Sequence, residues 1–112
     1  MNNSLPLPDE KKLLITYRVE SGCLGPEGEC YVSSFCEFAQ RQIQPLYADF
    51  IAWNVVSRDD KHEPEIQYNL VTKRVNHSQA SRYFAAFGSS IDQFEIDLSE
   101  RLAELIDEFM GH

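Results

Sequence analysis

The stretch KLLITYRVESGCLGPEGEC, residues 12–30, decides which kind of fold this sequence can form. Its first eight residues alternate, as a β-strand requires, because successive side chains of a strand point to opposite faces. One face is wholly apolar and consists of Leu13, Ile15, Tyr17 and Val19. The second half gathers glycine, proline and glutamate, residues that favour a turn. The stretch therefore predicts a strand that ends in a corner.

A helix is predicted to leave this corner over residues 27–44. Val32, Phe35, Cys36, Ala39 and Ile43 recur at helical spacing, with polar residues between them. Pro45 ends the helical pattern, because proline cannot continue a helix and disfavours helical backbone in the residue before it.

Two further strands are predicted at residues 48–56 and 65–71. The first is rich in aromatic and β-branched residues, and the second alternates between apolar and polar side chains. The polar segment between them, closed by Pro64, predicts a hairpin with a long loop. Helices follow over residues 77–88 and from about residue 90 to Gly111, the second with a capping motif at Ser89–Asp92 or Ser90–Gln93.

The element order β-α-β-β-α-α predicts an α+β two-layer sandwich. We expect a three-stranded, mainly antiparallel sheet with the helices on one face, in the element order of the ferredoxin-like fold without its fourth strand. Such a sheet leaves an edge open. Residues 1–10 are expected to form a flexible N-terminal arm, and residues 11–112 a single α+β domain.

Composition restricts the classes of function. The 112 residues carry a net charge of −8, and the segment 89–112 holds seven of the 18 acids but one base. Direct nucleic-acid binding is disfavoured, because it depends on neutralising phosphates. No apolar run reaches the ~18 to 20 residues of a membrane helix, and no secretory signal pattern is present at the N-terminus. We expect a cytoplasmic protein without membrane partners, with three reduced thiols.

The cysteines of the corner define a possible thiol site at Cys23 and Cys30. A helix N-terminus lowers the pKa of a nearby thiol, whereas the neighbouring glutamates raise it. The spacing of the three cysteines matches neither a C-x-x-C motif nor a zinc ribbon. Cys36 shares the apolar face of its helix and is expected to be buried. A purely structural corner is the competing interpretation.

The segment SRDDKHEPE, residues 57–65, is the candidate for a metal or a general base. Carboxylates bind Ca²⁺ or Mg²⁺, and a histidine beside carboxylates can take a proton. The spacing does not match a known calcium loop, and Arg58 and Lys61 neutralise part of the charge, so a solvated loop tip competes with this interpretation. The candidate ligands are Asp59, Asp60, His62 and Glu63.

The last helix combines an apolar face with an acidic face, hereafter the acidic stripe. The stripe consists of Asp97, Glu100, Glu104, Asp107 and Glu108. We expect a non-enzymatic interaction or regulatory module that acts through this stripe and the open sheet edge, with no cofactor. Its partners would be a second copy of the chain, as a homodimer, or a basic protein. The alternative is a thiol- or metal-dependent enzyme or a metal-binding protein centred on Cys23, Cys30 and the 59–63 loop.

Overall fold

The computed structural model describes residues 5–111, and the first four residues of the predicted N-terminal arm lie outside this range. Residues 5–8 precede a short 3-10 helix, and the Leu7 N–H donates to the Asp49 carbonyl. The elements in chain order are η1 (Asp9–Lys11), β1 (Leu13–Val19), η2 (Ser21–Leu24), α1 (Gly28–Gln42), β2 (Ile51–Ser57), β3 (Ile66–Leu70), β4 (Lys73–Val75), α2 (His77–Ala86) and α3 (Ile91–Met110).

The sheet is built around β1, with the strand order β2-β1-β3-β4. β2 is parallel to β1, and β3 and β4 are antiparallel to their neighbours. The mixed α+β fold and the mainly antiparallel pairing are therefore as predicted. The three-stranded sheet is wrong, because a fourth strand lies between β3 and α2. The ferredoxin-like order is not confirmed, since that fold places its fourth strand after the second helix.

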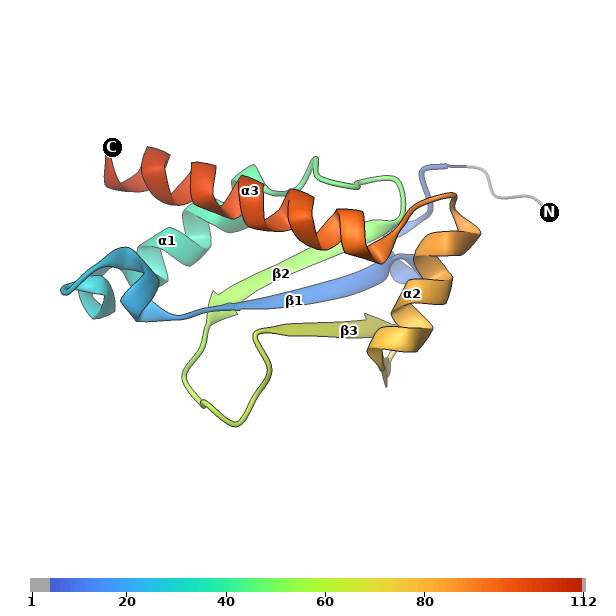
Figure 1. Ribbon diagram of the computed structural model, residues 1–112, viewed down its shortest axis with the longest axis horizontal. Coiled ribbons are helices and arrows are strands. Elements are labelled where there is room, and N and C mark those ends of the chain that lie inside the picture. Colours follow the sequence, from blue (N-terminus) through green and yellow to red (C-terminus); the bar gives the residue numbers. More distant parts are fainter. Residues whose placement is uncertain (1–4, 112) are drawn as a thin grey trace.

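The predicted hairpin between the second and third strands is also wrong. β2 and β3 lie on opposite sides of β1, and residues 58–65 cross the end of β1 to connect them (Figure 1). Arg18 fixes this crossing, because its guanidinium donates to the Pro64 carbonyl at 2.9 Å and to Glu63 at 3.2 Å. A polar loop with a proline is compatible with both connections, and only the pairing of β1 distinguishes them.

The sequence does not predict β4, because the two residues before it are not of the types that favour a turn. Val71 and Thr72 alone separate β3 from β4, and Val71 has a φ of 61°. Two-residue hairpin turns normally place glycine, asparagine or aspartate at positive φ, and a β-branched residue there is unusual. The sequence pattern therefore gave no reason to end β3 at Leu70.

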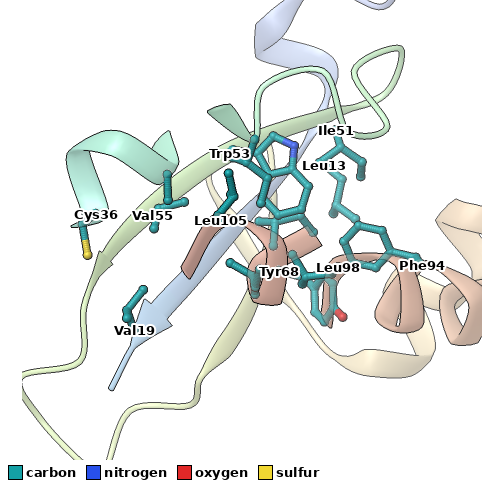
Figure 2. Close-up of a cluster of buried hydrophobic side chains, with 14 of the residues drawn as sticks. Leu13, Val19, Cys36, Ile51, Trp53, Val55, Tyr68, Phe94, Leu98 and Leu105 are labelled. Carbon is teal, nitrogen blue, oxygen red and sulfur yellow. The ribbon is translucent and has the colours of Figure 1, made fainter. Parts of the chain in front are cut away.

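The hydrophobic core lies between one face of the sheet and the helices α1 and α3 (Figure 1). Figure 2 shows side chains of β1, β2, β3 and α3 converging in this layer. Trp53 stacks on Phe94, and Phe94 contacts Phe84 of α2 with ring centroids 4.7 Å apart. Leu98, Leu102 and Leu105 of α3 are buried within the single chain, so these three side chains need no second subunit to cover them.

The caps of α2 and α3 can be compared with the sequence-based prediction. Ser90 caps α3 by accepting from the Gln93 N–H, which is one of the two predicted starts. α2 begins with a capping box in which Asn76 and Gln79 satisfy each other's backbone N–H groups. No helix within residues 5–111 has the length and apolar character needed to cross a membrane.

Candidate functional site

The glycine-rich corner between β1 and α1 is tightly packed at Gly28. Gly28 is buried at the start of α1, and a Cβ atom there would lie 1.7 Å from the backbone carbonyl oxygen of Ser21. Gly25 has a φ of 95°, a conformation that glycine adopts readily. These contacts support the structural interpretation of the corner.

The three thiols divide as the helix pattern predicts. Cys36 is buried, whereas Cys23 and Cys30 are exposed, and all three are free. Burial raises the pKa of the Cys36 thiol to about 11. A site with an activated thiol needs a lowered pKa, so Cys36 is unsuited to that chemistry.

Three acidic side chains of the 57–65 segment are bound to other groups of the same chain. Asp59 accepts from the Ser57 hydroxyl, and Glu63 is paired with Arg18. His62 lies 3.0 Å from Asp60, and the hydrogen bonds from the His62 backbone and ring lower the pKa of Asp60. Within residues 5–111, no group of three or more histidine, cysteine, aspartate or glutamate side chains is placed to hold a metal ion.

A cleft lies where the parallel strands β1 and β2 end, and its volume is about 610 Å³. Its charges are of both signs. Arg58 is bound to Glu20 and also donates to the Lys61 and Glu63 carbonyls, so its guanidinium is occupied. Glu29 and Asp59 also line this cleft. The cleft consequently offers neither a concentrated positive charge for an anion nor a cluster of ligands for a cation.

The acidic stripe on α3 is only partly available. Asp97 accepts a 2.7 Å hydrogen bond from the Tyr47 hydroxyl, which lowers the pKa of this carboxyl. Arg101 lies 3.1 Å from Glu104 and 3.6 Å from Glu108 and so neutralises part of their charge. Glu100 is exposed on the helix surface. The stripe is thus a partly neutralised acidic border rather than five independent carboxylates.

A groove lies between α3 and the sheet. Its first part is a cavity of about 240 Å³ over β1 and β3. Ile106 and Leu102 of α3 face Tyr17 and Ile66 of the strands there, with small side chains between them. The complete lining is Tyr17, Glu65, Ile66, Leu98, Ser99, Leu102, Ala103 and Ile106.

The second part of the groove is polar and has a volume of about 360 Å³. Glu95 accepts a 3.3 Å hydrogen bond from the Tyr68 hydroxyl, and its Oε2 also lies 3.2 Å from His77 Nε2. Burial, and then the neighbouring Glu95, raise the pKa of Tyr68. Both parts include Ile66, so we treat them as one surface and call it the α3–β3 groove.

Carboxylates lie along this groove. Glu65 lines its apolar part and Glu95 its polar part, and Arg74 stands at the far end beside β4. Burial, and then the nearby Glu65, raise the pKa of Tyr17 in the floor. The α3–β3 groove therefore joins an apolar floor to a rim that carries two carboxylates and, at its far end, Arg74.

The sequence contains one sign of this groove. Ala103 and Ile106, which line the groove, extend the apolar arc of α3 beyond the residues that the core buries. Asn76 caps α2, and the next residue, His77, contacts Glu95 through its ring. The groove itself depends on the strand order, which the sequence did not define.

A comparison of the chain with protein-family models, with curated proteins and with solved structures finds no match.

Proposed function

We propose that this chain is an interaction module that binds a basic, amphipathic segment of another protein in the α3–β3 groove. The observation that supports the proposal is an apolar floor with carboxylates along its rim, beside a helix whose core face is already buried. An amphipathic helix laid into a hydrophobic groove is a recurring mode of peptide recognition.

The apolar part of the groove provides the anchor. Ile106 and Ile66 are only partly buried, and Ala103 is exposed, so an incoming side chain displaces water from all three. Burying one leucine- or methionine-sized side chain there contributes about 1.5 to 3 kcal/mol. Binding free energy at interfaces is commonly concentrated in one or a few such anchors.

The acids determine the sign of the partner. The chain carries a net charge of −8, and α3 with its flanks is the most acidic part. Such a field accelerates the approach of a basic segment and disfavours an acidic one. Glu95 and Glu65, which line the two parts of the groove, are the proposed partners of a lysine or arginine next to the anchoring residue.

A second copy of the chain fits this groove poorly. Two-fold pairing through α3 would bring two acidic helices together, at a cost in electrostatic repulsion. The sequence-based argument for a homodimer also loses its premise, because Leu98 and Leu105 are buried within one chain. A homodimer through another surface stays a prediction.

The experiment is a calorimetric titration with a synthetic amphipathic peptide of leucine and lysine, about 14 residues long, which is the length of an ordinary helix. A leucine–glutamate peptide of the same pattern is the charge control. Ala103→Arg fills the groove from an exposed position, and Ala85→Arg makes the same change at an exposed position on α2. We expect Ala103→Arg to weaken binding at least about tenfold, or 1.4 kcal/mol, and Ala85→Arg to have little effect. Equal binding of both peptides, or equal binding by both variants, would contradict the proposal.

A further inference from the structure

β2 is an edge strand, but part of its outer edge is already occupied. The side chain of Gln40, on α1, contacts two backbone groups of β2 that do not face β1. Its Nε2 donates to the Trp53 carbonyl at 2.9 Å, and the Val55 N–H donates to its Oε1 at 2.8 Å. A single side-chain amide thus satisfies one acceptor and one donor of the strand edge.

These two backbone groups are the ones that a neighbouring strand would use. In a parallel pair, one residue of the neighbour binds the carbonyl of one residue and the N–H two residues further on. Gln40 makes this pair of contacts with Trp53 and Val55. The amide therefore takes the place of one residue of an added strand.

The sequence of β2 lacks the features that usually protect an edge strand, so the contact with Gln40 matters. Edge strands are usually protected by charge, proline, a bulge or shortness. β4, the other edge, is three residues long and carries Lys73 and Arg74. β2 has seven residues, IAWNVVS, and contains neither a charged residue nor a proline. Among the described residues, Gln40 is the side chain that occupies its outer hydrogen-bonding groups at Trp53 and Val55.

We propose that the outer edge of β2 is a strand-pairing site that Gln40 keeps closed, and that its occupant when Gln40 is removed is β2 of a second copy of this chain. Two copies related by a two-fold axis pair antiparallel. With the axis at Asn54, Trp53 of one copy faces Val55 of the other, and the groups released by Gln40 bind each other. A hollow of about 350 Å³ beside the edge, lined in part by Cys36 and Val56, leaves room for the approaching strand.

The test compares Gln40→Ala with Gln44→Ala by light scattering over a range of protein concentrations. Gln44 is an exposed glutamine just beyond α1 whose side chain donates only to the Gln40 backbone carbonyl among the contacts of the described residues, so it is a matched control. The proposal expects Gln40→Ala to gain mass with concentration beyond the wild type, and Gln44→Ala to behave as the wild type. A Gln40→Ala protein that keeps the wild-type mass at every concentration would overturn it.

Amide hydrogen exchange keeps the proposal testable if Gln40→Ala folds poorly. In the wild type the Val55 N–H is expected to be protected, although no strand within residues 5–111 lies on the outer side of β2. In dilute Gln40→Glu, the carboxylate is repelled by the Trp53 carbonyl oxygen and is expected to leave the strand edge. Val55 then loses its acceptor and should exchange at least about tenfold faster. Rapid exchange of Val55 in the wild type would show that Gln40 does not close the edge. This experiment does not involve the α3–β3 groove, so its failure leaves the proposed function standing.

Discussion

The hydroxyl of Tyr47 donates a 2.7 Å hydrogen bond to the carboxylate of Asp97 and ties the segment after α1 to the middle of α3. Tyr47 has a φ of 55°, and its ring packs edge-on against Phe94 with centroids 5.1 Å apart. The contact fixes one side of α3, and the α3–β3 groove lies along the other side. The position of α3, and with it the width of the groove, therefore depends partly on this pair.

Tyr47→Phe is expected to lower the melting temperature by a few degrees in a pH-dependent way. Burial, and then the bond to Asp97, raise the pKa of Tyr47 from 10.0 to about 12, so this contribution is complete below pH 10 and is lost as the pH rises toward 12. The bond lowers the pKa of Asp97 from 3.8, so that contribution is complete above this value and is lost as the pH falls below it. The difference from the wild type should thus be largest between about pH 5 and 9.

Thermal melts at several pH values check this expectation, with Tyr31→Phe, a change on the exposed surface of α1, as the control. A Tyr47→Phe effect that is the same at pH 3 and pH 7 would show that the hydrogen bond to Asp97 does not carry it.

Gly28→Ala should destabilise the protein severely. The new methyl group would lie 1.7 Å from the Ser21 carbonyl oxygen, and backbone cannot yield as a flexible side chain can. We expect a loss of about 3 kcal/mol or more, at the upper end of overpacking effects. Gly22→Ala is the control, because nothing lies within 4 Å of the added atom. Chemical denaturation measures both, and equal stability of the two variants would contradict the packing of the corner.

Leu105→Ala should cost about 2 to 5 kcal/mol, the usual range for a fully buried leucine. Ile96→Ala, on the same helix but 52% exposed, should cost much less. Because Leu105 is buried within one chain, the urea midpoint of Leu105→Ala should not depend on protein concentration. A midpoint that rises with concentration would mean that a second subunit, and not the sheet of the same chain, covers this residue.

Thiol alkylation should proceed in two phases. Cys23 and Cys30 are exposed, whereas Cys36 is buried and has a pKa of about 11, so it presents little thiolate at pH 8. Mass spectrometry of the native protein should show two rapid additions and one slow addition, and all three should be rapid in urea. Cys36 reacting as fast as Cys23 in the native state would contradict the position of α1.

The elements were predictable where the residue pattern is local. The spacing of Phe35, Cys36 and Ala39 predicts α1, and the alternation around Ile15 predicts β1. The pairing of the strands was not predictable, because a polar loop can close a hairpin or cross a neighbouring strand. Arg18, buried at the end of β1, holds the crossing loop by donating to the Pro64 carbonyl. This contact becomes visible only once the fold is known.

The acidic residues near the candidate site could be predicted from the sequence, but the shape of the groove could not. The acidic stripe follows from helical periodicity, but its partners Tyr47 and Arg101 decide how much of it is available. The floor of the groove joins Ile66 of β3 to Ile106 of α3, residues 40 positions apart in the chain. Their proximity is a consequence of placing β3 next to β1, a strand order that the sequence pattern did not determine.

The most direct test of the central claim is a map of amide shifts in isotope-labelled protein during titration with the leucine–lysine peptide. The proposed function predicts that the largest changes cluster at Tyr17, Ile66, Ala103 and Ile106, and that Ala103→Arg removes them while Ala85→Arg does not. Changes confined to the corner around Cys23, or to the loop around Asp60, would contradict it.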